Sequence, residues 1–352
     1  MSDVAPKANR RWIVVPWAIL ILAVAGWSAW WMVSAREVGN RMDEQAKSLR
    51  EKGYAVSWKT RSIGGYPFRY FVQLREAQIG VPDGWGLSAP KLDAETSALT
   101  PGIVVLVAPQ GVTLSRPGKP ALTVTGEVLR MSLGGLDRTP PRISIEGKGL
   151  RLAAAGGGEI TFPAIDRFEA RLAPADAGKA SLFFRIDKAT PRADSLLARV
   201  AGAAAVTVDV EGTLSQASGL TGTGPDSALV NWLTAGGKFE VTQGGMALGE
   251  TTLFSLKPSA VGADQDGRLT GKLRLSTGKA GEAMVALGEV SVLPPETAAV
   301  ASGIGDGSQV LTALIGEASI TLQFHDGQAW AGPLALGPAP RVFTPPEPTA
   351  PE

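Results

Sequence analysis

The first strong pattern along the chain is an unbroken run of uncharged, mostly apolar residues near its start. Residues 12–33 read WIVVPWAILILAVAGWSAWWMV and hold no charged side chain. A helix of about 22 residues is about 33 Å long, enough to cross the hydrocarbon core of a bilayer. Tryptophans lie toward both ends of the run, as they do at membrane interfaces. The pattern predicts a transmembrane anchor, with the bilayer itself as partner.

Charges around this run predict its orientation. Lys7, Arg10 and Arg11 lie in the short tail 1–11, whereas the residues after the run carry mixed charges. The positive-inside rule then favours a cytoplasmic N-terminus and a body on the far side of the membrane. A cleaved signal peptide is the alternative, because Val33-Ser34-Ala35 loosely fits a small-x-small site. An h-region is usually about 7–15 residues long, so the length of the run favours an uncleaved signal anchor.

The hydrophobic period then changes twice. Residues 34–53 are polar, with Val38, Met42, Ala46 and Leu49 at helical spacing, which predicts a helical stalk. From Tyr54 onward apolar and polar residues alternate, as in residues 206–211 (VTVDVE). Alternation with period two predicts strands that have one apolar and one polar face, typical of antiparallel sheets.

These elements together predict a mainly β protein. We expect an extended, curved antiparallel sheet over residues 54–337, a few short helices and one N-terminal transmembrane helix. Two lobes with a break near 188–226 are an alternative. Short helices are predicted at 226–235, 307–316 and, more weakly, 192–201. The proline-rich segment 338–352 predicts a disordered tail.

Composition removes several classes of function. The chain has 34 Lys+Arg against 33 Asp+Glu, without the basic excess of a nucleic-acid-binding protein. It has no cysteine and one histidine, His325, so a metal site built on several His or Cys ligands is excluded. We expect no cofactor and no nucleic-acid partner.

Candidate chemical groups are few, and each has a simpler interpretation. His325 with Asp326 and Gly327 fits a solvated turn better than a general base. Gly156-Gly157-Gly158 lacks the helix and lysine of a phosphate-binding loop. Asp264, Asp266 and Gly267 lack the later carboxylates of a calcium loop. The pairs Asp93/Glu95 and Asp209/Glu211 are expected on solvated strand faces rather than across a glycosidase cleft. We therefore expect no catalytic residue.

The most distinctive local cluster is Gly64-Gly65-Tyr66-Pro67-Phe68-Arg69. Glycine tolerates positive φ, and Pro67 restricts both its own backbone and that of Tyr66. The cluster predicts a bend that begins a strand. The alternative is a special corner that docks a partner or a lipid.

Four stretches in this order resemble an uncharacterised bacterial envelope family, domain of unknown function 2125. They are the membrane helix with the Gly64–Arg69 turn, a Trp-x-x-x-Gly-Gly element at Trp232, Gly236 and Gly237, residues 266–273 (DGRLTGKL), and the ending Asp326-Gly327 through 332–340 (GPLALGPAP). The resemblance covers roughly residues 10–340 and implies a bacterial inner membrane, a periplasmic body and no catalytic residues. The ending also loosely resembles AsmA-like envelope proteins.

The sequence thus favours a non-enzymatic, membrane-anchored protein of the cell envelope. The leading expectation is an interaction or scaffold protein with an envelope protein as partner. The alternative is binding or transfer of a lipid or another hydrophobic ligand along the curved sheet. The absence of a polar constellation together with the many alternating strands motivates both.

Overall fold

The computed structural model describes residues 11–99, 102–277 and 318–342. Its helices are α1 (Arg11–Glu51), α2 (Leu196–Ala201) and α3 (Pro225–Thr234), with short 3-10 helices η1 (Ala155–Gly157) and η2 (Ala217–Gly219). The predicted helices at 226–235 and 192–201 correspond to α3 and α2. The predicted helix at 307–316 lies outside the described residues.

Most of the remaining residues form strands, which confirms the mainly β class. The strands are β1 (Ala55–Ser57), β2 (Thr60–Gly64), β3 (Arg69–Gly80), β4 (Gly86–Ser97), β5 (Ile103–Val107), β6 (Val112–Arg116), β7 (Lys119–Thr125), β8 (Val128–Gly134), β9 (Arg142–Ala154), β10 (Ala164–Pro174), β11 (Ala180–Thr190), β12 (Val206–Leu214), β13 (Phe239–Leu248), β14 (Thr251–Ala263), β15 (Leu269–Thr277), β16 (Ala318–His325), β17 (Gln328–Ala331) and β18 (Leu334–Pro338).

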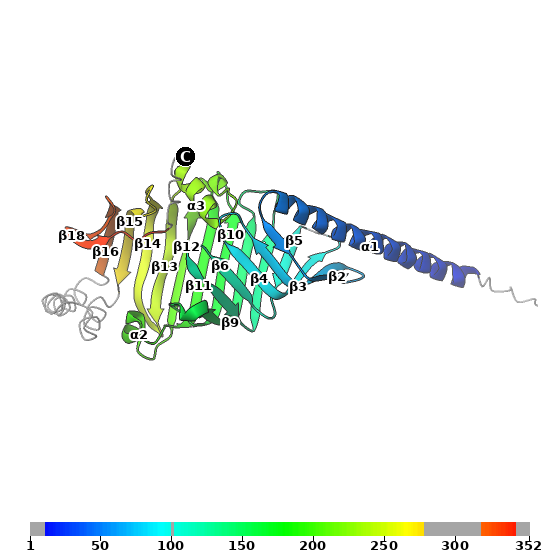
Figure 1. Ribbon diagram of the computed structural model, residues 1–352, viewed down its shortest axis with the longest axis horizontal. Coiled ribbons are helices and arrows are strands. Elements are labelled where there is room, and N and C mark those ends of the chain that lie inside the picture. Colours follow the sequence, from blue (N-terminus) through cyan, green and yellow to red (C-terminus); the bar gives the residue numbers. More distant parts are fainter. Residues whose placement is uncertain (1–10, 100–101, 278–317, 343–352) are drawn as a thin grey trace, which may run out of the picture.

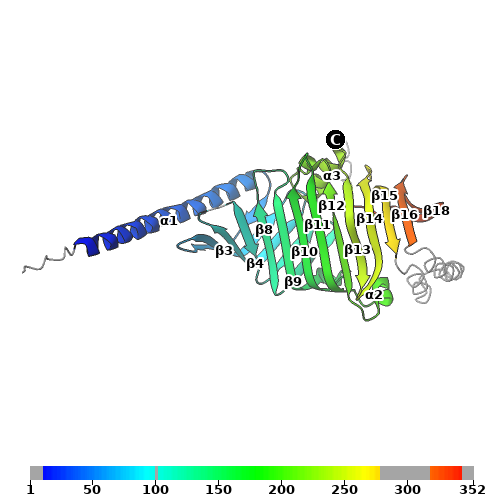
Figure 2. The ribbon, with the colours of Figure 1, turned by 180° about the vertical axis from the view of Figure 1, so that it is seen from behind.

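The strands form one antiparallel meander (Figures 1 and 2). From β9 to β18 each strand pairs with the strand that follows it in the chain. Between β4 and β9 the sheet departs from this simple order. Two short strands, β5 and β6, pair side by side along β4, and two more, β7 and β8, pair along β9. Pairing of β11 with β12 and of β12 with β13 runs through residues 188–226, so a division into two lobes finds no support in the strand pairing.

Helix α1 is continuous over 41 residues and joins the predicted anchor to the predicted stalk. Its segment Val15–Glu51 is long and apolar enough to cross a membrane, and its apolar part is almost unburied within the protein. A membrane anchor and a signal sequence both have these properties. The helix leaves the sheet at the end that carries β2 and β3, whereas β16–β18 form the opposite end (Figure 1).

The end of the sheet is more ordered than the proline-rich sequence predicted. Of the segment 338–352, residues 338–342 are described. Ala339 is buried with Phe324 and Ala329, the Val342 N–H donates to the Gly267 carbonyl over 2.8 Å, and the Leu269 N–H donates to the Pro340 carbonyl over 2.9 Å. These contacts fasten the chain to the β14–β15 turn.

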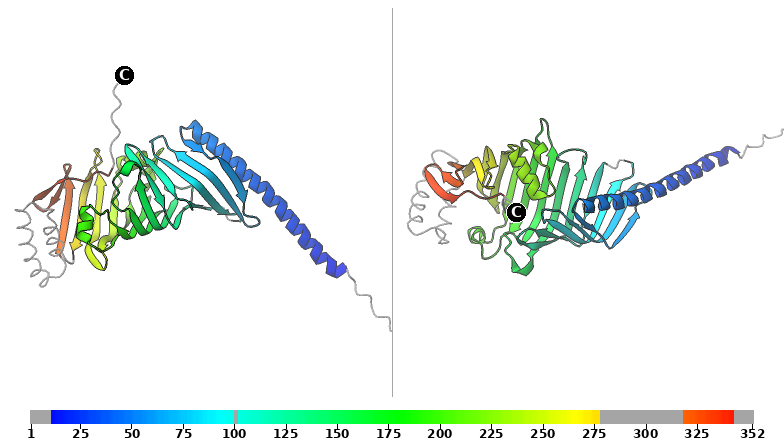
Figure 3. Two further views of the ribbon diagram at one scale, coloured as in Figure 1. Left: turned by 60° about the horizontal axis from the view of Figure 1, so that its bottom comes forward. Right: turned by 45° about the horizontal axis from the view of Figure 1, so that its top comes forward.

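The sheet is bent rather than flat (Figure 3). The turn between β3 and β4 reaches the start of α3, about 140 residues later. Thr223 Oγ1 donates to Asp83 Oδ1 over 2.8 Å, the Ser227 N–H donates to Asp83 Oδ2 over 3.1 Å, and Trp85 Nε1 donates to Asp226 Oδ2 over 2.9 Å. The β3–β4 turn and α3 belong to distant parts of the sheet, so they can meet only because the sheet curls.

This contact predicts a pH dependence of stability. Partial burial raises the pKa of Asp83, but the hydrogen bonds from Thr223 and Ser227 outweigh it, so the pKa lies below its ordinary value of 3.8. A lowered folded-state pKa adds stability that is full above pH 3.8 and lost as the pH falls through the lower value. Asp83→Ala should cost about 0.5–2 kcal/mol at neutral pH, as loss of a helix N-terminal acceptor does.

Urea unfolding of the full chain in detergent, followed by circular dichroism from neutral to acidic pH, measures this difference. The difference in the free energy of unfolding between wild type and Asp83→Ala should disappear below pH 3.8. Asp266→Ala, at an exposed turn, is the matched control and should leave stability unchanged. A gap that stays constant down to low pH would contradict the role given to the Asp83 carboxylate.

Candidate functional site

The corner Gly64–Arg69, singled out by the sequence, docks on α1. Trp27 Nε1 donates to the Pro67 carbonyl over 3.0 Å, and Trp31 Nε1 donates to the Arg69 carbonyl over 3.3 Å. The hydroxyls of Ser28 and Tyr66 lie 2.8 Å apart in a hydrogen bond. The corner is therefore both the bend that begins β3 and the point where the sheet meets the apolar helix.

Gly65 makes this corner possible. Its φ is +99°, and a Cβ built there would lie 2.6 Å from the Arg69 carbonyl oxygen. A side chain would thus be strained in its own backbone and would collide with the strand that follows. Only glycine lets the chain turn back closely enough to present Tyr66 and Pro67 to the helix.

The polar part of α1 is fixed to the same end of the sheet. Arg61 on β2 makes a two-pronged ion pair with Asp43, at 2.7 and 2.9 Å, and donates to the Gly39 carbonyl over 3.1 Å. Val38 and Met42 pack against Val72 and Leu74 of β3. The predicted stalk is therefore part of the body, and the apolar helix and the sheet hold a fixed orientation.

One face of the sheet carries an unbroken row of apolar positions. Residues directly paired in an antiparallel ladder share a face, so the row can be followed strand by strand from β2 to β16. We call this set of paired residues the apolar row: Ile63, Val72, Ala94, Leu106, Met131, Ile145, Ala170, Phe184, Val210, Gly244, Leu256, Leu275 and Ile320.

Among the residues of the apolar row, Val72 is the only one that is fully buried. Val72 is buried under the helix. From Leu106 to Leu275 the side chains of the row are only half-buried, and Ile320 is exposed. The buried clusters lie beside the row, one around Leu150 and Ile165 and another around Leu214 and Trp232. The row is therefore an accessible apolar strip and not the centre of a closed core.

The curl of the sheet places the row on its inner side. Leu229 and Leu233 of α3 pack against the same buried cluster as Leu172 and Leu182. Leu172 and Leu182 lie on the face of the apolar row. Helix α1 packs on the same face at Val72. Since the β3–β4 turn bends round to touch α3, the face that carries both helices is the concave one.

The opposite face carries the polar residues, including both carboxylate pairs weighed from the sequence. Asp93 contacts Lys91 and Gln73, and Glu95 pairs with Arg69 at 2.7 Å. Glu211 accepts a bond from Gln243, and Asp209 pairs in register with Arg185. Each carboxylate lies on a strand face, opposite the apolar row, and not across a cleft from its neighbour.

The Trp-x-x-x-Gly-Gly element closes one side of the strip. Trp232 on α3 is buried with Leu214 and Ala217, and its Nε1 donates to the Ser215 carbonyl over 2.6 Å. A Cβ at Gly237 would lie 2.3 Å from the Trp232 ring, so glycine is required by close approach. Gly236 has a φ of +78° at the turn after α3. The element is structural and holds α3 over the sheet.

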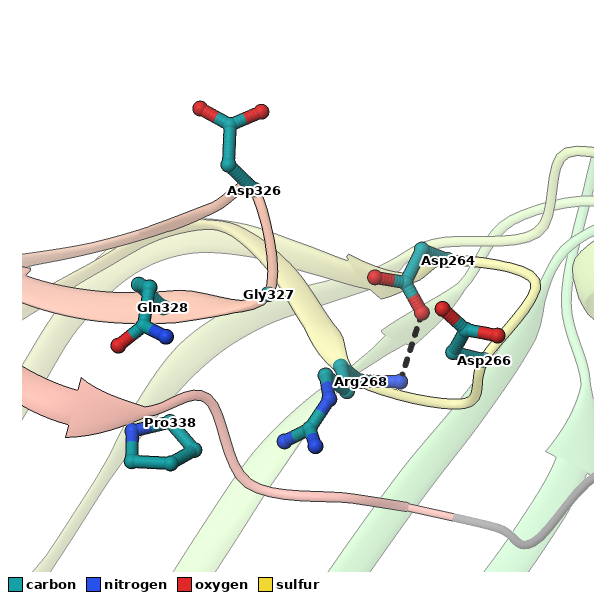
Figure 4. A pocket seen from close by; sticks show the side chains of 7 residues that line it. All are labelled: Asp264, Asp266, Arg268, Asp326, Gly327, Gln328 and Pro338. Carbon is teal, nitrogen blue, oxygen red and sulfur yellow. Dashed lines mark hydrogen bonds between the residues drawn. The ribbon is translucent and has the colours of Figure 1, made fainter.

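The remaining candidates occupy turns. His325 Nδ1 lies 2.9 Å from Asp326 Oδ2, and the ring stacks on Trp330. Asp264 accepts the Arg268 N–H in the β14–β15 turn, beside a hollow of about 470 Å³. Figure 4 shows Asp326 pointing away from Asp264 and Asp266.

Gly156 and Gly157 lie in η1, between β9 and β10. Among the described residues, no group of three or more His, Asp or Glu is arranged to hold a metal ion.

The fold defines the class first: a mainly β protein with one N-terminal helix that is apolar enough to enter a membrane. The chain belongs to the family described as "Uncharacterized protein conserved in bacteria (DUF2125)", whose model matches residues 31–340. No match was found among curated proteins or solved structures. The family resemblance read from the sequence is thereby confirmed.

Proposed function

We propose that this protein is a non-enzymatic inner-membrane protein whose periplasmic sheet holds lipid acyl chains along the apolar row. The observation that carries the proposal is the continuity of the row from β2, beside α1, to β16 at the far end. Thirteen strand positions at about 4.8 Å spacing give a strip about 57 Å long. The row therefore favours the lipid alternative over the protein scaffold that the sequence placed first.

The energetics of exposure support an apolar occupant. Apolar surface left in water costs roughly 25 cal/mol per Å², and contiguous apolar patches beyond a few hundred Å² generally mark binding sites. An acyl chain needs only a continuous apolar path and no hydrogen-bonding groups. The row offers such a path, whereas the opposite face offers ion pairs such as Arg130–Glu146.

The proposal includes retention of the N-terminal helix as an anchor. Trp27, Ser28 and Trp31 hydrogen bond to the corner between β2 and β3. Cleavage after Ala35 would remove all three contacts, which supports an uncleaved helix. The basic residues Lys7, Arg10 and Arg11 support a cytoplasmic N-terminus.

Photocrosslinking tests the proposal on two adjacent residues of β11. Phe184 belongs to the apolar row, whereas Phe183 faces the other side, beside Arg171. Each is replaced in the full chain by p-benzoylphenylalanine, which keeps the phenyl ring and adds a photoreactive benzoyl group, in bacteria fed a radiolabelled fatty acid. Measured along the sheet, β11 lies about 34 Å from β2, and position 183 on the same strand controls for chance contact with bilayer lipids. We expect labelled lipid on the protein at 184 and none at 183.

The alternatives give different results. A protein crosslink at 184 without lipid would support the scaffold and overturn lipid binding. Equal lipid labelling at 183 and 184 would show contact without a preference for the apolar face, and would also overturn the proposal. Both variants are compared by circular dichroism with the parent chain, so that only folded protein enters the comparison.

A further inference from the structure

We propose that the sheet touches the bilayer directly through a second, strand-borne surface beside the anchor. This surface, the apolar rim, consists of Tyr66, Phe68, Leu99 and Ile103, each between 50 and 65 % exposed. The inference depends on α1 crossing the membrane, as in the proposed function, but not on any ligand of the apolar row.

The four side chains come from two neighbouring connections of the sheet. The Ala98 N–H donates to the Phe68 carbonyl over 2.9 Å, which joins the β4–β5 connection to the corner before β3. Thr96 Oγ1 donates to the Ile103 carbonyl over 2.8 Å, which brings the start of β5 beside them. The rim is thus one surface that belongs to a rigid part of the sheet.

The depth of the rim follows from its bonds to α1. The uncharged part of α1 runs from residue 12 to 35, between Arg11 and Arg36, and a bilayer core takes about 20 residues of helix. Centred on that stretch, the core ends near residue 33. Ser28 then lies about 8 Å inside it along the helix at 1.5 Å per residue. Because Ser28 bonds Tyr66 and Trp31 bonds the Arg69 carbonyl, the corner lies in the outer part of the core, from about 8 Å to about 3 Å inside its edge at 1.5 Å per residue.

The composition of the rim suits that level. No charged residue lies between Arg61 and Arg69, and none lies between Glu95 and Arg116. Tyrosine and tryptophan favour the membrane interface, and the Trp27 ring lies tilted beside Phe68 with ring centroids 6.4 Å apart. The charged residues that border these two uncharged segments include Arg69 and Glu95, which form an ion pair. An exposed apolar surface joined to a membrane helix at this height fits the outer part of the acyl-chain region, just inside the head groups.

Lipid quenching of single-cysteine variants tests the rim. The chain has no cysteine, so Phe68→Cys and Leu99→Cys each carry one nitrobenzoxadiazole label. The full chain is reconstituted in vesicles of phosphatidylethanolamine and phosphatidylglycerol that contain doxyl-lipid quenchers at a shallow and at a deep acyl position, so that labels near the bilayer edge and near its midplane are both within reach of a quencher. Leu336→Cys, on β18 and 54 % exposed, is the matched control, and Val24→Cys on α1 reports the anchor.

We expect the labels at 68, 99 and 24 to lose most of their fluorescence and the label at 336 to keep it. Quenching at 24 without quenching at 68 and 99 would overturn the rim alone. Absence of quenching at 24 would overturn the anchor and the rim together. Quenching at 336 as strong as at 68 would mean that the whole body lies on the bilayer, which also overturns a specific rim. Ile103→Cys replaces any variant whose circular dichroism shows misfolding.

Discussion

Replacing Trp232 by alanine is expected to lower the free energy of unfolding by about 3–5 kcal/mol, the usual cost of removing a large buried aromatic side chain. Trp232 is 6 % exposed and packs with Leu214 and Ala217. Its removal leaves a cavity between α3 and the sheet and frees the Ser215 carbonyl that its indole N–H contacts. Urea unfolding of the full chain in detergent, monitored by circular dichroism, measures the loss.

Two controls separate packing from the hydrogen bond. Trp232→Phe keeps most of the packing and loses the bond, so it should cost less than the alanine variant, with about 1 kcal/mol from the bond itself. Trp30→Ala removes an exposed indole from α1 and should leave the unfolding of the sheet unchanged. Equal stability of Trp232→Ala and the wild type would contradict the role of α3 as a packed side of the strip.

Placing a carboxylate in the apolar row should remove lipid from it. Val210 pairs directly with Phe184 across β12 and β11, so Val210→Asp puts a charge beside the photoreactive position. An acyl chain there would strip water from an unpaired carboxylate, which costs several kcal/mol. We expect lipid crosslinking at 184 to fall at least tenfold, which corresponds to about 1.4 kcal/mol. Val210 is only half-buried, and circular dichroism checks that the variant folds like the parent chain.

The matched control places the same charge on the other face. Ser181 lies on β11 with its side chain exposed, and its register position is one residue out of phase with the apolar face. Ser181→Asp should leave crosslinking at 184 unchanged. An equal loss in both variants would indicate a general effect of charge on the protein, and unchanged crosslinking in Val210→Asp would mean that the row is not the lipid path.

The alternation of residue types predicted the strands because it reports which face of a strand is apolar. Residues 206–211 illustrate this, since Val206, Val208 and Val210 do share one face in the structure. The same pattern could not predict the row. A slip of one residue in any pair moves a strand's apolar side chains to the other face, and register depends on irregularities such as those between Glu211 and Gly212.

The sequence also did not predict that the Gly64–Arg69 corner docks on α1. The bend itself was predicted from Gly65 and Pro67. Its partner on α1 lies about 40 residues earlier, and two of the three bonds use backbone carbonyls, of Pro67 and Arg69, which leave no mark on residue type. The only available signal was the coincidence of exposed aromatics at the corner with tryptophans at the helix end.

The simple meander from β9 to β18 has a consequence for how such a molecule changes over evolution. Because successive strands lie side by side from β9 to β18, duplication of one hairpin would lengthen the body by about 10 Å without rethreading the chain. The number of hairpins then sets how far the sheet extends from α1. Relatives of different length are expected to differ mainly in that number.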